Sequence, residues 1–172
     1  MRKPADKIKK AVHCTLIAYA VHWDFGLLQP FGIPLSLITQ RVKFGGENQG
    51  GARFGTPSVG VGDVNGDGFG DVLVGAGLSD TSGGADAGKV FCYLGSSSGL
   101  SAMPAWSSIG HNLAGAFFGT FLMPAGDVNG DGFKDVIIGA YGSGGGGRAY
   151  VYQGSSSGLS AVPAWTSVGD NQ

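Results

Sequence analysis

The chain has 172 residues, of which 34 are glycine, and only 13% of its residues are charged. This length is enough for one ordinary core, and the many aromatic and branched aliphatic residues exclude a disordered linker. The net charge of −1 hides a basic segment, residues 1–45, and an acidic remainder in which six of ten acids lie in two short loops. The chain therefore offers no basic surface of the kind that binds nucleic acid.

Residues 1–20 fit a secretory signal peptide, and they fit an ordinary basic helix equally well. Basic residues run to Lys10, a short apolar stretch covers residues 11–17, and Ala18-Tyr19-Ala20 offers a small-x-small cleavage site. A cleaved signal would place the protein outside the cytoplasm, at the cell surface, in the periplasm or in the extracellular space.

Residues 21–45 are assigned to no element. The apolar run between residues 11 and 38 is broken by Asp24, Pro30 and Pro34, so no transmembrane span is expected. The chain has two cysteines, Cys14 and Cys92, and these imply no disulfide framework. Cys92 falls in an expected strand, where a small buried side chain is a better interpretation than a reactive thiol.

Two stretches beyond residue 45 are nearly identical. GDVNGDGFGDVLVGA begins at Gly62 and GDVNGDGFKDVIIGA at Gly126, and they differ at three of fifteen positions. GSSSGLSAMPAWSSIG from Gly95 likewise matches GSSSGLSAVPAWTSVG from Gly154. Self-similarity at a fixed period indicates a repeat protein. We assign the first repeat to residues 46–109, the second to residues 110–169, and the beginning of a third to residues 170–172.

Each repeat is expected to form four short strands, which in the first repeat cover residues 52–61, 71–76, 89–94 and 105–109. Branched and aromatic residues fill these segments and turn residues separate them, whereas no helical period is present. The predicted fold is all-β, with each repeat a four-stranded antiparallel blade of a partial β-propeller. Residues 77–88 and 141–147 differ in length between the repeats and are expected to be tolerant surface loops.

Four aromatic residues recur at matching places in the two repeats. Trp106 and Trp165 lie on the expected fourth strands, and Phe54 and Phe118 lie on the expected first strands. They are candidates for packing between blades, although ordinary core packing is the favoured interpretation.

The acidic loops are the candidate functional sites. Each places Asp, Asn, Asp and Asp at loop positions one, three, five and nine, with a carbonyl ligand expected from the Phe at position seven. Alternating oxygen side chains of this kind suit Ca²⁺, which takes about six to eight oxygen ligands in irregular geometry, better than Mg²⁺. An EF-hand is excluded because position twelve is Val74 or Ile138 rather than Glu, and a bare hairpin turn would not require three aspartates twice. The predicted ligands of the two Ca²⁺ sites are Asp63, Asn65, Asp67, Phe69 and Asp71, and Asp127, Asn129, Asp131, Phe133 and Asp135.

The repeats resemble the FG-GAP repeat of integrin alpha-subunit propellers. Phe54-Gly55 and Phe118-Gly119 match its first signature, and Gly75-Ala76-Gly77 and Gly139-Ala140-Tyr141 match the second except for its proline. The resemblance covers residues 46–169. It implies a bladed propeller with calcium in the loop between the first two strands of a blade.

These features favour a calcium-binding module for extracellular protein interaction or adhesion, and they do not favour an enzyme. Gly95–Gly99 and Gly154–Gly158 match G-x-S-x-G, but they join expected strands and lack the strand-to-helix turn and the histidine partner of a nucleophile elbow. A carbohydrate-binding propeller, with an exposed tryptophan as platform, is the alternative, and part of a secreted hydrolase is a weaker one. The partner is a protein or a glycan, and further blades or self-association are expected.

Overall fold

The computed structural model describes residues 49–170. The predicted signal peptide, the unassigned segment 21–45, and Asn171 and Gln172 of the expected third repeat lie outside the described residues. The described part is all-β, as predicted, and it contains no helix long and apolar enough to cross a membrane. Eight strands form it: β1 (Ser58–Gly62), β2 (Asp71–Ala76), β3 (Lys89–Tyr93), β4 (Trp106–Ser108), β5 (Phe121–Gly126), β6 (Asp135–Ala140), β7 (Arg148–Tyr152) and β8 (Trp165–Val168).

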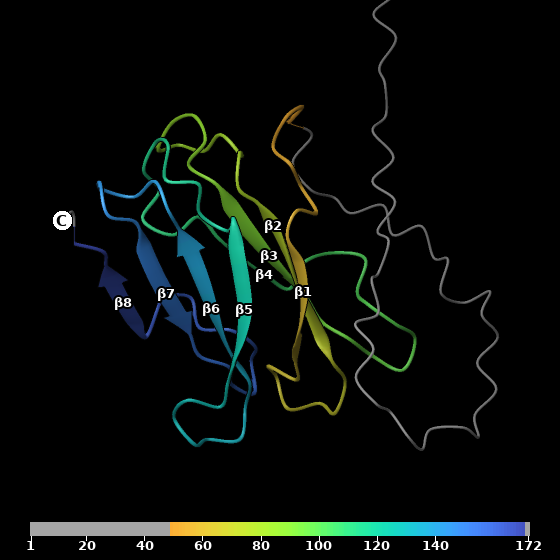
Figure 1. Ribbon diagram of the computed structural model, residues 1–172. Helices are drawn as coiled ribbons and strands as arrows, with labels where there is room; N and C mark the ends of the chain where they lie inside the picture. The colour runs from red at the N-terminus through yellow and green to blue at the C-terminus, as the bar shows by residue number, and fades with distance from the viewer. Residues whose placement is uncertain (1–48, 171–172) are drawn as a thin grey trace, which may run out of the picture. The chain divides into compact units, whose positions relative to one another are not determined.

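The strands make two four-stranded antiparallel sheets, ordered β1-β2-β3-β4 and β5-β6-β7-β8. Each sheet is one sequence repeat, and its strands follow one another in chain order, as in a propeller blade. Figure 1 shows the two sheets side by side, with β1 next to β5. The prediction of two antiparallel blades is confirmed.

The central strand β2 is apolar on both faces because both faces are covered. Leu73 is fully buried in the cluster shared between the two sheets, and its neighbour Val74, also buried, belongs to a second cluster on the other face. A strand buried on both sides needs no alternation of polar and apolar residues. This explains why β2 appears in the sequence as a short continuous apolar run.

The first strand of each repeat is shorter than predicted. We expected residues 52–61, but β1 begins at Ser58, since the preceding segment turns. Arg53 and Gly55 have φ of 53° and 94°, in the left-handed region, and two such residues so close together interrupt an extended strand. The Gly55 N–H donates to the Gly75 carbonyl at 2.9 Å, which anchors this turn against β2.

The main core lies between the two sheets. The first sheet contributes Val61, Leu73, Val90 and Cys92, and the second contributes large side chains that include Phe118, Ile138, Tyr150 and Tyr152. Burial, with the nearby charge of Asp71, raises the pKa of the Cys92 thiol to about 12. Cys92 is therefore a packing residue, as expected.

Of the four recurring aromatic residues, two pack between the sheets and two do not. The Trp106 and Tyr152 rings pack edge to face, with their centroids 5.0 Å apart. The Trp106 Nε1–H donates to the Ser160 carbonyl at 2.9 Å. Phe118 is buried in the shared cluster. Phe54 instead packs on Phe91 of its own repeat, and Trp165 is 51% exposed.

The loop of residues 77–88 is not the free surface loop that we expected. It runs alongside the segment that leads into β5 of the second sheet. The N–H groups of Gly115, Phe117 and Phe118 donate to the carbonyls of Ala85, Asp86 and Ala87 at 2.9–3.0 Å. Asn112 Oδ1 accepts hydrogen bonds from the Thr81 hydroxyl and from the Gly83 N–H. The extra length of this loop therefore serves contact between the sheets.

Candidate functional site

The two acidic loops occupy equivalent places in the two sheets. Residues 63–70 join β1 to β2, and residues 127–134 join β5 to β6. Figure 1 shows both loops at the same, lower edge of the sheets, opposite the edge where residues 77–88 lie. The repeat thus brings two copies of one candidate site to one edge of the molecule.

The aspartate at position one organises the backbone of each loop. In the first loop, Asp63 Oδ1 accepts the N–H groups of Gly66 and Asp67 at 2.6 and 3.1 Å, and its Oδ2 accepts the Gly68 N–H at 2.7 Å. Partial burial would raise the pKa of Asp63, but these backbone hydrogen bonds outweigh it and lower the pKa. The loop is therefore wound around an ionised carboxylate.

Asp127 does the same in the second loop. Its carboxylate accepts the N–H groups of Gly130, Asp131 and Gly132 at 2.7, 3.1 and 2.9 Å. The hydrogen bond from Gly132 is the largest of the effects that lower the pKa of Asp127.

The residues at positions three and five point to each other at the loop tip. Asn65 Nδ2 donates to Asp67 Oδ2 at 2.9 Å, and Asp67 Oδ1 accepts the Phe69 N–H at 2.9 Å. Asn129, Asp131 and Phe133 repeat both hydrogen bonds at 2.7 and 3.0 Å. The side chains of Asp67 and Asp131 are exposed, so the tip presents oxygen atoms to solvent.

The aspartate at position nine lies beneath the loop. Asp71 is 1% exposed, and it accepts the Val64 N–H on Oδ2 and the Gly95 N–H on Oδ1, both at 2.8 Å. Asp135 binds the N–H groups of Val128 and Gly154 in the same way, at 2.8 and 2.9 Å. Each of these carboxylates ties its acidic loop to the connection between the third and fourth strands.

Crowding of negative charge is already visible in the first loop. Burial raises the pKa of Asp71, the amide hydrogen bonds of Gly95 and Val64 oppose this effect, and the charges of Asp67 and Asp63 raise the pKa further. Three carboxylates thus act on one another within a few residues. A cation among them would relieve that repulsion.

The donor set fits a hard cation, although the side chains do not enclose one as they stand. Among residues 49–170 no group of three or more His, Cys, Asp or Glu side chains is close enough to hold an ion, and the loop amides occupy many of the carboxylate oxygens. All of the donors are oxygens, as Ca²⁺ requires, and each carboxylate oxygen has a second lone pair.

The serine-rich segments are turns. Residues 95–99 lie between β3 and β4, where Ser96 Oγ hydrogen-bonds to Ser98 Oγ and to the Gly99 carbonyl at 3.0 and 2.7 Å. His111 instead pairs through Nδ1 with the Tyr150 hydroxyl at 3.0 Å. The structure therefore gives Ser96 the role of a turn residue, as the sequence indicated.

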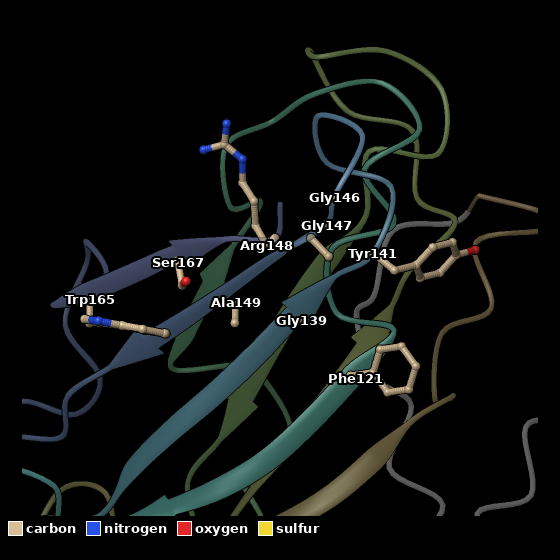
Figure 2. A pocket seen from close by; sticks show the side chains of 11 residues that line it. Phe121, Gly139, Tyr141, Gly146, Gly147, Arg148, Ala149, Trp165 and Ser167 are labelled. Carbon is tan, nitrogen blue, oxygen red and sulfur yellow. The ribbon is translucent and has the colours of Figure 1, made fainter. Parts of the chain in front are cut away.

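A second surface of interest is the outer face of the second sheet. A hollow of about 400 Å³ lies there, beside the exposed rings of Phe121, Tyr141 and Trp165. Figure 2 shows these side chains on the strands that carry them. The sequence does not distinguish the exposed Trp165 from Trp106, because the two residues occupy equivalent positions in the repeat.

The matching face of the first sheet is covered. The counterparts of Trp165 and Ser167 are Trp106 and Ser108, and both hydrogen-bond to the second sheet, Ser108 through the Tyr152 hydroxyl at 2.9 Å. At Gly75, the counterpart of Gly139, an added Cβ would lie 2.4 Å from the Gly119 carbonyl oxygen. The hollow therefore lies on the face of the second sheet that is equivalent to the face of the first sheet covered by its neighbour.

Comparison with known proteins assigns the repeats. The FG-GAP repeat family matches residues 55–91 and 118–152, which fall within the two expected repeats and contain both acidic loops. The two sheets are FG-GAP repeats.

Several relatives are integrin alpha chains. This chain is 38% identical over 116 residues to integrin alpha-IIb of Mus musculus, in an alignment that covers 67% of this chain and 11% of the relative. Integrin alpha-4 of Xenopus laevis is 36% identical over 123 residues, covering 71% of this chain and 12% of the relative. Integrin alpha-PS3 of Drosophila melanogaster is 42% identical over 94 residues, covering 52% and 8%. The chain spans about a tenth of the length of these relatives.

Proposed function

We propose that this chain supplies two calcium-binding blades of an integrin-alpha-like propeller that mediates extracellular protein interaction or adhesion. The observation that carries the proposal is the identical construction of the two acidic loops at one edge of two FG-GAP repeats. The proposal includes an extracellular or cell-surface location and a non-enzymatic role, and the likeness to integrin alpha chains supports both.

In the first loop the Asp63, Asn65, Asp67 and Asp71 side chains and the Phe69 carbonyl would hold the ion. The second loop would use Asp127, Asn129, Asp131, Asp135 and the Phe133 carbonyl. Bound calcium supplies positive charge that removes the repulsion among the three carboxylates of a loop. Because the unfolded chain does not preassemble these ligands, the free energy of binding becomes free energy of folding. Calcium would thereby fix the edge of each blade and leave the opposite edge and the outer faces for partners.

Calorimetric titration with CaCl₂ and thermal unfolding in EDTA test the metal sites. We expect two bound ions and a higher melting temperature with calcium, because a ligand that binds only the folded state stabilises it. Asp67→Ala and Asp131→Ala should each remove one site. Asp170→Ala, at an exposed acid outside the loops, should leave both sites intact. Absence of binding at millimolar calcium would contradict the proposal.

A carbohydrate-binding role is the second candidate, since Trp165 is exposed beside Tyr141 and Phe121 on the hollow of the second sheet. Aromatic rings with polar neighbours such as Arg148 and Ser167 can line a ligand site. The coverage of the equivalent face in the first sheet favours a protein surface as the occupant. Binding to a glycan array that free sugar displaces, and that Trp165→Ala abolishes, would instead favour the carbohydrate role.

A further inference from the structure

The two acidic loops are in direct contact. The Phe133 ring of the second loop lies against Gly66 of the first, where an added Cβ would come within 2.7 Å of Phe133 Cε1. The next residue continues the contact: the Lys134 N–H donates to the Asp63 carbonyl at 3.1 Å, and its Cγ lies 3.1 Å from where a Cβ on Gly62 would stand. Two residues of one loop thus support the backbone of the other.

The second sheet also holds Val64 of the first loop. The Val64 carbonyl accepts the Ser155 N–H at 3.1 Å, and its side chain is fully buried in the core between the sheets. Val64 lies between the predicted ligands Asp63 and Asn65, and its own N–H binds Asp71. The position of two ligands in the first loop is therefore determined in part by the second sheet.

The second loop has no equivalent support among the described residues. Its glycines at positions 126, 130 and 132 face open space, with no atom within 4 Å of an added Cβ. Val128, the counterpart of Val64, is 56% exposed, and Phe69, the counterpart of Phe133, is 41% exposed. Two loops of nearly identical sequence therefore stand in different surroundings.

We propose that Phe133 is a positioning residue for the neighbouring cation site, so that the two sites are unequal and coupled. This inference rests on the proposed calcium binding. Ordering of the second loop around its ion fixes Phe133 and Lys134, and these hold the backbone of the first loop in its binding form. A site that is ordered beforehand loses less conformational entropy when it binds. The first site is therefore the tighter one, and filling the second site raises its affinity.

Linkage makes this coupling reciprocal, since the factor by which one site strengthens the other must be the same in both directions. The ring of Phe133 transmits the effect across the contact with Gly66, whereas its carbonyl is the predicted ligand of its own site. A change of side chain therefore separates the two roles of this residue.

The test uses proteins with one site each, because Asp131→Ala leaves the first site and Asp67→Ala leaves the second. Calcium should bind the first site of the Asp131→Ala protein on the order of tenfold more weakly than that of the wild type, within the usual range of coupling between sites. Adding Phe133→Ala should weaken binding further, because the ring contact with Gly66 is then lost. In the Asp67→Ala protein, the matched change Phe69→Ala should alter affinity less than twofold, because the Phe69 ring does not support the second loop. Calorimetric titration gives both values, and Phe133→Leu, which keeps most of the apolar contact, should lie between wild type and Phe133→Ala.

The contact of the Phe133 ring with Gly66 can also be tested without calcium. Amide hydrogen exchange of Gly66 and Gly68 in EDTA should accelerate in Phe133→Ala, while that of Gly130 and Gly132 should not accelerate in Phe69→Ala. If the wild type bound no calcium, the proposed function would fail. The exchange result would still show whether Phe133 supports the backbone of the first loop. Equal effects of the two Phe variants, or loss of affinity only at the second site, would overturn the inference.

Discussion

At the scale of single residues, the aspartates of one loop perform different tasks. Asp63 shapes the backbone of the loop and stays ionised, while Asp67 lies exposed at the tip. Asp71 is buried, and its carboxylate accepts the N–H groups of Val64 and Gly95 from two different segments. A ligand pattern in the sequence treats these three carboxylates alike, but only one of them is also part of the core.

In EDTA, Asp71→Ala should therefore destabilise the protein more than Asp67→Ala does. Removal of the buried carboxylate leaves the Val64 and Gly95 amides without acceptors, at a cost of about 2–4 kcal/mol for the two groups together. The exposed Asp67 should cost under about 1 kcal/mol. Urea unfolding followed by tryptophan fluorescence measures both, and equal losses would show that Asp71 acts only through calcium.

At the scale of elements, contact between the sheets depends on the absence of side chains at a few glycines. Gly75 of β2 faces the Gly119 carbonyl, whereas Gly139 of β6 faces only the Phe121 side chain at 3.1 Å and beyond. These two glycines occupy the same place in the repeat, so they form a matched pair with different neighbours.

Gly75→Ala should cost about 1–3 kcal/mol, the usual range for overpacking, because a backbone carbonyl cannot move aside as a side chain can. Gly139→Ala should be close to neutral, since it opens onto the hollow and its neighbour can shift slightly. Thermal unfolding of the two variants compares them directly. Equal destabilisation would mean that strand geometry, and not contact between the sheets, requires these glycines.

The two loops that differ in length should also differ in tolerance. Three additional Gly/Ser residues between Gly144 and Gly145, both exposed, should change stability by well under about 1 kcal/mol, since loop closure depends weakly on length. The same insertion after Gly83 should cost more, because Gly83 and Thr81 both hydrogen-bond to Asn112 across the sheets. Circular dichroism melts of both insertions test this, and an equal response would indicate that the longer loop contributes nothing to stability.

At the scale of the whole molecule, the described part is a stack of two sheets whose last face is open. Phe121, Met123 and Trp165 are 64%, 62% and 51% exposed there. Strand β8 is exposed along its length, and within residues 49–170 it pairs with β7 alone. An open apolar face beside a free edge strand favours association with another β-surface.

The isolated chain should therefore self-associate through this face. Light scattering over a concentration series should show a mass that rises with concentration, and the double change Phe121→Ser with Trp165→Ser should lower it. Trp106→Ser, at the covered counterpart, should instead unfold the protein, because it breaks the contact with Tyr152 and Ser160. A strictly monomeric chain at high concentration would contradict this prediction.

The sequence alone determined the repeat, the strands β2 and β3 almost to the residue, the all-β fold, and the two acidic loops. These features depend on local spacing: turn residues, short apolar runs and alternating oxygens act within a few positions. The late beginning of β1 was not predicted, since the left-handed φ at Arg53 has no distinctive residue type to mark it.

Tertiary structure decided what near-identical residues do. Val64 and Val128 share one motif, yet the first is fully buried and the second 56% exposed. Trp106 is held by the neighbouring sheet, whereas Trp165 lines an open hollow. Local spacing is the same in both repeats, but the position of each repeat in the stack determines which faces are covered. Only the tertiary structure therefore determines which residues are buried and which residues of the two sheets touch. The support of the first acidic loop by the second depends on these contacts.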